Sequence, residues 1–597
     1  MSLWQRRQPG TDLPWGSAQL QGGGQSWAVY LLVALFLIIF AVQAFTSALK
    51  KSNTWDESGH LLSGYAHMKK GMDWLEPSHP AFGRILAAAP LLFLPLEDPL
   101  EVVRSQEAQN SNLYIASLVF LFKNRISGER LLALSRLMVI LLGVILGLYV
   151  YRWALLLFGP KGGLLALFLY SLSPNILAHA RLVTTDFPAT ALAFIAMYHF
   201  WSFSRQPGVK RAIAAGFFSG LAFATKYNTL FILLPMATWA LWALVSTIRS
   251  KPVAGQPRRL VVGLLTVGAV AYITIWGVYG FHFRSPLYQK HMTQSAIYFW
   301  EKNQPSFPLL ASAMDSCRQA RILPESYLYG LCRLLGRAQE GHLAYLMGQI
   351  AQTGWWYYFI LAFLFKTPVS TLLLLFATLL FFLKIREATW TSLNFLLLPA
   401  VVVFLFTSRQ NINIGLRHVL PAYPFLLVLI ARVVHYESQH QKLARWILGL
   451  LCIWAVWDAA LIYPHYLAYF NGLVGGPSGG RYVLVDSNLD WGQDLKGLKV
   501  YMERQGIRKV KLGYFGLSDP AYYDFDYDLL PSYCIAGRPT CREKNPGTLE
   551  LKGTVAVSAT LLEGLYCPGD IYRRLRGLEP TANIGYSIYI FQFKTVQ

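Results

Sequence analysis

Charged residues are scarce in this sequence: they make up 14% of its 597 residues, whereas hydrophobic residues make up 54%. An average soluble domain has roughly a quarter charged residues and about 45–50% apolar ones. This shortage of charge excludes a disordered chain, a collagen-like repeat and an ordinary multidomain cytosolic enzyme. The long apolar runs that stand in place of the charges predict a polytopic α-helical membrane protein.

Cysteine and acidic residues are also few. Six cysteines in a chain of this length exclude a disulfide scaffold. The 31 acidic residues face 53 basic ones, which gives a net charge of +22. Such a balance suits a nucleic-acid partner, but basic residues also gather at the cytoplasmic ends of spans in any many-span protein. Because no RNA- or DNA-binding motif accompanies the charge, we expect no nucleic-acid partner.

Eleven segments are candidates for membrane spans, since a span needs about 20 mostly apolar residues. They are Trp27–Leu49, Leu131–Phe158, Gly162–Ala180, Phe187–Phe203, Ala212–Thr225, Thr229–Ile248, Leu260–Phe281, Thr367–Leu383, Ser392–Thr407, Val419–Val434 and Trp446–Tyr463. Two further apolar stretches, Ile85–Leu96 and Trp355–Phe365, are expected to lie as helices in the membrane interface.

The short loops indicate the orientation. Those after the fourth, sixth, eighth and tenth spans hold twelve Lys and Arg residues, against four in the short loops on the other side. The positive-inside rule therefore predicts a cytoplasmic tail at 1–26, a membrane domain at 27–463 with outer loops at 50–130 and 282–366, and an extracytoplasmic region at 464–597. Five cysteines fall in these outer regions, which agrees with an oxidising exterior: Cys317, Cys332, Cys534, Cys541 and Cys567.

The region 464–597 alternates strand-like and helix-like segments, so it predicts a small α/β domain. Strands are expected at Tyr482–Val485, Val510–Phe515, Thr554–Ser558 and Ser587–Phe593, and helices at Leu495–Gln505 and Ile571–Leu578. Within it, Asp486, Asp490 and Asp494 recur every four residues; caps and turns explain this spacing better than a cation site.

The first outer loop opens with Asp56-Glu57, followed by His60. Two adjacent carboxylates at a membrane surface are costly to desolvate, and their pKa values can be raised into a range that is useful for proton transfer. In a helix, both acids would lie on the same face as His60. The same acids would also suit a solvated helix N-terminus, where negative charge favours the helix dipole.

Other polar residues collect on the same predicted side of the membrane. His79 lies in the Pro-flanked stretch that leads to Arg84, and Asp186 precedes the fourth span, where it can also cap the helix. Cations end or begin spans at Lys226 and at Arg417-His418, where snorkelling is the simpler explanation. Together these residues place acids, histidines and cations at one membrane face.

The order of these motifs resembles the GT-C glycosyltransferases over roughly residues 25–465. It is most similar to the protein O-mannosyltransferases and the lipid A aminoarabinose transferases, which use a polyprenyl-phosphate sugar donor. The tandem acid Asp56-Glu57, His79-Pro80 and the run Arg417-His418-Val419-Leu420-Pro421 carry the resemblance. It implies an inverting glycosyltransferase that moves a sugar from a polyprenyl-phosphate carrier to an extracytoplasmic acceptor, which is a protein, lipid or glycan. The tail, with the run 486–494, resembles that of bacterial members, which implies a bacterial inner (plasma) membrane location.

The resemblance also implies roles for the site residues. Asp56 would act as the general base, with Glu57 and Asp186 orienting the substrates. Arg417, Lys226 and His418 would bind the donor phosphate. The substrate-positioning residues would be His60, His79 and Arg84. The resemblance identifies no certain cofactor and leaves a divalent metal open.

Two other functions remain open from the sequence. In a membrane metallo-hydrolase, Glu57, His60, His79 and Asp186 would ligate a metal, because Glu-x-x-His is a known ligand spacing. A lipid-linked sugar transporter would need internal repeats and polar groups in the middle of the membrane. The polar residues gather instead at one face, so the transporter ranks last.

Overall fold

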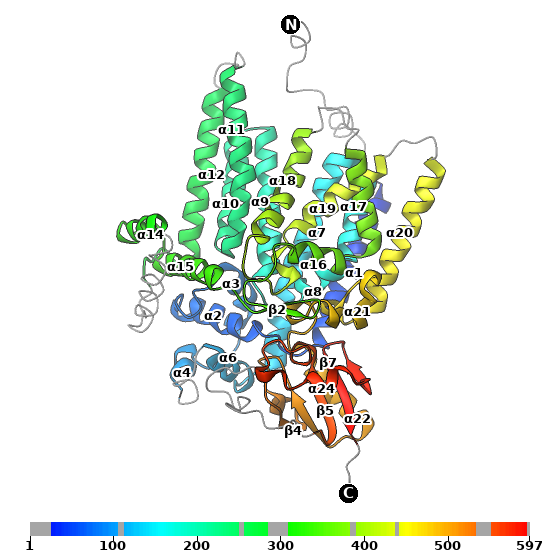
Figure 1. Ribbon diagram of the computed structural model, residues 1–597. Helices are drawn as coiled ribbons and strands as arrows, with labels where there is room; N and C mark the ends of the chain where they lie inside the picture. Colours follow the sequence, from blue (N-terminus) through cyan, green and yellow to red (C-terminus); the bar gives the residue numbers. More distant parts are fainter. Residues whose placement is uncertain are drawn as a thin grey trace.

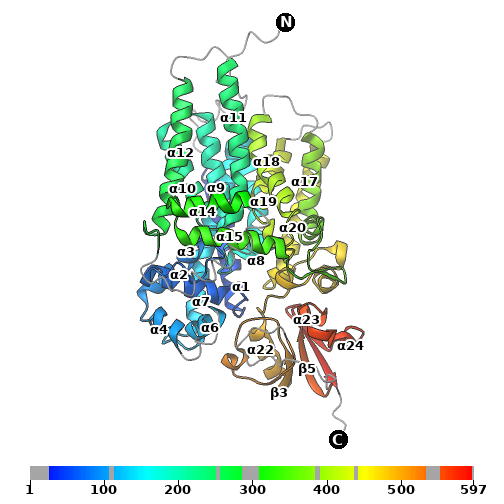
Figure 2. The ribbon, with the colours of Figure 1, turned by 60° about the vertical axis from the view of Figure 1, so that its left-hand side comes forward.

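The computed structural model describes residues 26–105, 113–249, 256–284, 308–382, 390–435, 441–532 and 551–593. Long helices stand side by side through one part of the molecule, and a β-sheet built from the C-terminal region lies at the other end (Figure 1). Two helices, α14 (Pro308–Gln319) and α15 (Glu325–Glu340), lie across the standing helices (Figure 2).

Several helices are long and apolar enough to cross a membrane, although they are fewer than the eleven spans predicted from the sequence. Among the described residues, five segments are long and apolar enough to cross a membrane: Trp27–Leu49 (α1), Gly128–Ser171 (α7), Tyr227–Thr247 (η2 with α11), Pro257–Val278 (within α12) and Gln441–Ile462 (α20). A sixth is the pair α16 (Tyr358–Lys366) and α17 (Val369–Phe382), which is bent by 114°. The protein is therefore a helical membrane protein, and eleven spans stay a prediction.

The remaining predicted spans form helices that do not combine the length and the apolar character of these six. They form α8 (Pro174–Ala180), α9 (Asp186–Arg205), α10 (Val209–Phe223), α18 (Trp390–Thr407) and α19 (Ala422–Ile430). The predicted second and third spans meet within α7, which is interrupted at Gly159, where φ is 69° and Pro160 follows. Proline lacks the N–H that a continuous helix needs, so two helices join at this point.

Short helices follow α1 before α7 begins. They are α2 (Glu57–Lys70), α3 (Phe82–Ala88), η1 (Ala89–Phe93), α4 (Pro99–Arg104) and α6 (Leu113–Phe122). The helical part of the prediction for Ile85–Leu96 is confirmed by α3 and η1, and that for Trp355–Phe365 by α16. The sharp bend between α16 and α17 separates that helix from the span that follows.

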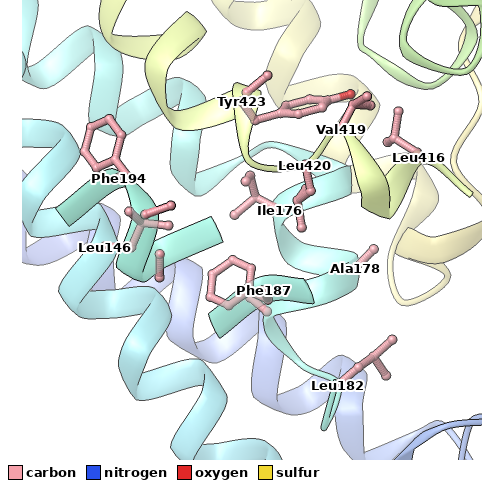
Figure 3. Close-up of a cluster of buried hydrophobic side chains, with 14 of the residues drawn as sticks. Leu146, Ile176, Ala178, Leu182, Phe187, Phe194, Leu416, Val419, Leu420 and Tyr423 are labelled. Atoms are coloured by element: carbon pink, nitrogen blue, oxygen red, sulfur yellow. The ribbon is translucent and has the colours of Figure 1, made fainter. Parts of the chain in front are cut away.

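A hydrophobic core joins α7, α8 and α9 to the turn before α19 (Figure 3). Phe187 is fully buried directly after Asp186, and Leu416 and Val419 are buried on either side of Arg417-His418. Because these apolar neighbours share one core, two segments more than 200 residues apart in the chain lie together. Packing thus brings Asp186 next to Arg417.

The C-terminal region forms a five-stranded mixed sheet in the order β4-β3-β5-β7-β6. β3 (Lys509–Gly513) pairs in parallel with β4 (Asp526–Leu529) and β5 (Gly553–Ser558), while β7 (Ile588–Phe593) runs antiparallel between β5 and β6 (Ala582–Ile584). A two-stranded hairpin, β1 (Ala344–Leu346) with β2 (Gln349–Ala351), lies outside this sheet.

Most C-terminal elements match their prediction. The helix Leu495–Gln505 is α22, and three predicted strands correspond to β3, β5 and β7. The helix expected at Ile571–Leu578 is reduced to α24 (Arg573–Arg576). The prediction of a strand at Tyr482–Val485 is wrong, since η8 (Gly480–Tyr482) is followed by irregular chain. Val483, Leu484 and Val485 are all buried, so this apolar run fills the core without the alternation of a strand.

Candidate active site

Asp56 and Arg417 form an ion pair at the start of α2. The Arg417 Nη1 atom lies 2.9 Å from Asp56 Oδ2, and the Asp56 side chain keeps 25% of its surface exposed. Asp56 occupies the N-cap position, but its side chain makes no capping hydrogen bond. Its carboxylate therefore does not cap the helix and stays partly accessible to solvent.

A second acid shares the same arginine. Asp186, at the first residue of α9, lies 3.6 Å from Arg417 Nη1 through Oδ2 and 2.5 Å from Lys226 Nζ through Oδ1. Two carboxylates and two cations from four distant segments thus meet at one place. Burial lowers the pKa of Arg417, but Asp186 and Asp56 more than compensate and raise it, so the guanidinium stays charged. A guanidinium has five N–H donors, which is enough to hold these acids and a phosphate group.

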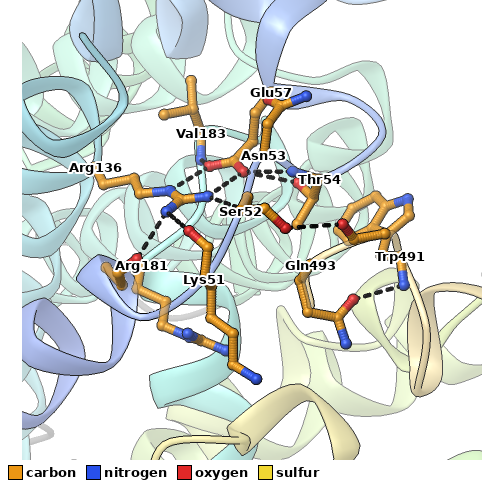
Figure 4. A network of polar contacts seen from close by, with 12 residues as sticks. Lys51, Ser52, Asn53, Thr54, Glu57, Arg136, Arg181, Val183, Trp491 and Gln493 are labelled. Carbon is orange, nitrogen blue, oxygen red and sulfur yellow. Dashed lines mark hydrogen bonds and ion pairs between the residues drawn. The ribbon is translucent and has the colours of Figure 1, made fainter. Parts of the chain in front are cut away.

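Glu57 lies next to Asp56 in sequence but has different partners. It is fully buried, and Arg136 from α7 donates to both of its oxygens, at 2.8 Å and 2.6 Å (Figure 4). The Thr54 and Val183 backbone amides also donate to the carboxylate. Burial alone would raise the pKa of Glu57, but Arg136 and these hydrogen bonds lower it. Its contacts fasten the start of α2, and with it Asp56, to α7.

His60, His79 and Arg84 form a separate group beside the acids. The His60 and His79 ring centroids are 5.7 Å apart, and Arg84 Nη2 donates to the His79 carbonyl oxygen at 2.8 Å. Burial lowers the pKa of His60 and, together with Lys226, that of His79. Both imidazoles are therefore neutral at pH 7, so they can position a substrate by hydrogen bonding but add no positive charge.

His418 follows the central arginine and packs against an aromatic ring. Its imidazole lies 5.6 Å from the Phe359 ring, measured between centroids. Burial and the Lys226 and Arg417 cations lower the pKa of His418 to about 3. In the neutral form this side chain can donate one hydrogen bond to a phosphate but supplies no charge to it.

Residues 114–276 match the family model described as dolichyl-phosphate-mannose-protein mannosyltransferase. The predicted resemblance to the GT-C glycosyltransferases is confirmed. The matched stretch covers α7 to α12 and includes Arg136, Asp186 and Lys226. No curated protein sequence matches this chain.

Two solved structures are similar to this chain at low identity. ArnT from Cupriavidus metallidurans bound to undecaprenyl phosphate shares 12% identity over 95% of this chain and 98% of its own, with a TM-score of 0.47. The oligosaccharyltransferase of Archaeoglobus fulgidus in the apo form shares 14% identity over 89% of this chain, with a TM-score of 0.45. This chain spans 63% of that archaeal protein.

The metal-binding alternative does not fit the geometry. Within the described ranges, no three His, Cys, Asp or Glu side chains come together in a group that could hold a metal ion. Both oxygens of Glu57 are bound by Arg136, so Glu57, His60, His79 and Asp186 do not form the predicted ligand set. The interpretation as a metallo-hydrolase on these ligands is therefore wrong.

Two residues of the candidate site were not predicted from the sequence. Arg136 is a charged residue inside a predicted span, which by itself signals that a buried partner exists. Trp491 lies under Arg417, with the guanidinium carbon 4.3 Å from the ring centroid. It stands in the acidic run 486–494, but no spacing in the sequence connects it with an arginine 74 positions earlier.

Proposed function

We propose that this protein is an inverting glycosyltransferase that moves a sugar from a polyprenyl-phosphate carrier to an extracytoplasmic acceptor. The observation that carries the proposal is the shared ion pair of Arg417 with Asp56 and Asp186. It places a candidate base and a candidate phosphate-binding cation in direct contact. The family match at residues 114–276 supports a lipid-phosphate donor, because the description of that family names dolichyl-phosphate-mannose.

The proposed reaction is a single displacement at the anomeric carbon. An acceptor hydroxyl or amine attacks this carbon on the side opposite the phosphate, and the bond between the sugar and the phosphate oxygen breaks. Asp56 takes the acceptor's proton as the new glycosidic bond forms. The polyprenyl phosphate leaves with one more negative charge, which Arg417 and Lys226 stabilise. A phosphate is a good leaving group, so no general acid is needed.

The remaining residues support this arrangement in the proposal. Glu57 orients Asp56 through its contacts with Arg136, while Asp186 holds Arg417 and Lys226 near the donor. His60, His79 and Arg84 lie where they would contact the sugar or the acceptor. The site would face the outside of the cell inner membrane, with 1–26 in the cytoplasm and 464–597 outside.

Replacing Arg417 by Ala is expected to lower sugar transfer by roughly 10²- to 10³-fold, because the developing phosphate charge loses its main counter-charge. The measurement offers membranes a panel of radiolabelled polyprenyl-phosphate sugars and follows label into acceptor fractions. Arg409→Ala is the matched control, since Arg409 lies in the same loop with an exposed side chain. Label that moves equally well with Arg417→Ala, or from no donor with the native protein, would contradict the proposal.

Replacing His418 by Gln is expected to leave the pH dependence of transfer unchanged between pH 6 and 8. A group whose pKa is about 3 stays neutral throughout this range, so its removal changes no charge. Initial rates measured at several pH values for native protein and variant test this. Loss of an acidic limb in the variant alone would show that His418 is cationic in the working enzyme.

A further inference from the structure

The chain at 486–494, which we call the 486–494 segment, lies against the loop that carries Arg417. Asn488 Oδ1 accepts a hydrogen bond from the Leu416 backbone amide at 2.9 Å, and the Ser487 hydroxyl donates to the Ile414 carbonyl. Asn488 Nδ2 in turn donates to the Tyr358 hydroxyl at 2.8 Å. These bonds tie the C-terminal region to the backbone directly before the arginine and to α16.

The same segment is also bonded to the loop that precedes Asp56. The Trp55 amide donates to the Trp491 carbonyl at 3.1 Å, and the Ser52 amide donates to the Gln493 carbonyl at 3.0 Å. Figure 4 shows Ser52 beside Trp491 and Gln493. The 486–494 segment therefore connects the two parts of the chain that supply the proposed base and the proposed phosphate-binding cation.

Trp491 is held rigidly within this segment. Its side chain is buried, and its backbone amide donates to Gln493 Oε1 at 2.7 Å. Gly492 follows with φ at 83°, and a Cβ there would lie 2.7 Å from the Gly516 Cα atom, so only glycine fits this turn. The indole therefore has a fixed place beneath Arg417.

We propose that Trp491 is a positioning residue for the donor: its indole holds the Arg417 guanidinium where it can contact Asp56, Asp186 and the donor phosphate. A cation–π contact attracts the charge without consuming an N–H donor. The donors stay available for carboxylates and phosphate. This inference rests on the proposed function, and it gives the C-terminal region a direct part in donor binding.

The test measures binding of undecaprenyl phosphate to the full-length protein in lipid nanodiscs. Trp491→Leu is expected to weaken binding about 5- to 30-fold, the range of a desolvated cation–π contact, and Trp491→Phe to weaken it less. The matched control is Tyr589→Leu, which removes the ring that lies 4.6 Å from a different buried arginine, Arg481. Undecaprenol, which lacks the phosphate, is the matched control ligand.

The outcomes separate this inference from the proposed function. If Arg417→Ala weakens binding of undecaprenyl phosphate but Trp491→Leu does not, the inference is overturned and the proposed function stands. If Arg417→Ala leaves binding unchanged, the proposed phosphate site itself fails. Equal weakening by Trp491→Leu and Tyr589→Leu, or equal loss of undecaprenol binding, would show a merely structural role and overturn the inference. Should Trp491→Leu not accumulate, Trp491→Phe carries the same comparison.

A double-mutant cycle measures the interaction between Trp491 and Arg417 directly, because a general structural effect of Trp491→Leu would not depend on the residue at position 417. In the Arg417→Lys background the cation no longer presents the planar guanidinium, so Trp491→Leu is expected to have a smaller effect than in the native background. Independent, multiplicative effects of the two substitutions would contradict a direct contact between the residues in the working enzyme.

Discussion

Replacing Asp56 by Asn is expected to reduce sugar transfer by roughly 10²- to 10⁴-fold, the contribution of a positioned general base. Asn has nearly the same shape but cannot take a proton from the acceptor. Arg417 keeps Asp186 as an ion-pair partner at 3.6 Å, so the substitution does not leave the guanidinium without a carboxylate. Membrane abundance is therefore expected to stay at the native level while the rate falls.

The measurement compares initial transfer rates normalised to the amount of folded protein in the membrane. Asp98→Asn is the matched control, because Asp98 is a carboxylate between α1 and α7 that pairs with Lys70 at the surface, with both side chains about one-third exposed. This control is expected to transfer sugar at the native rate. Full activity of Asp56→Asn would assign the base to another residue.

Replacing Glu57 by Gln is expected to act on stability, with a loss of about 3–5 kcal/mol of unfolding free energy. The substitution leaves the Arg136 guanidinium charged in a site where its side chain is only 2% exposed. Arg136 also donates to the carbonyl oxygens of Ala48, Lys51 and Ser52, so its displacement would disturb the whole loop before Asp56. Activity would fall because less protein folds.

Thermal unfolding of the purified protein in detergent tests this prediction together with membrane abundance. Arg125→Gln is the matched control, since the Arg125–Glu97 pair is exposed and such pairs contribute about 0–1 kcal/mol. A Glu57→Gln protein that unfolds at the native temperature yet transfers no sugar would contradict the structural role. It would place Glu57 among the groups that act on the substrates.

The contrast between Asp56 and Glu57 shows where sequence reasoning reaches its limit. Both acids follow the first span, and their spacing to His60 is compatible with one shared site. The structure separates them: Asp56 contacts Arg417, whereas Glu57 points into the protein toward Arg136. The difference arises from residues 79 and 361 positions away in the chain, which no local pattern identifies.

The sequence by itself determined the membrane class, most helix positions, the α22 helix and the resemblance that led to the candidate site. These features depend on local apolar runs and on motifs a few residues long. Only the tertiary structure decided which carboxylate is accessible, that the predicted metal ligands stay apart, that Tyr482–Val485 is not a strand, and that Trp491 lies under Arg417. Each of these depends on packing and ion pairing between distant segments. A buried charge is costly unless it is paired, so burial decides which charged residues lie together.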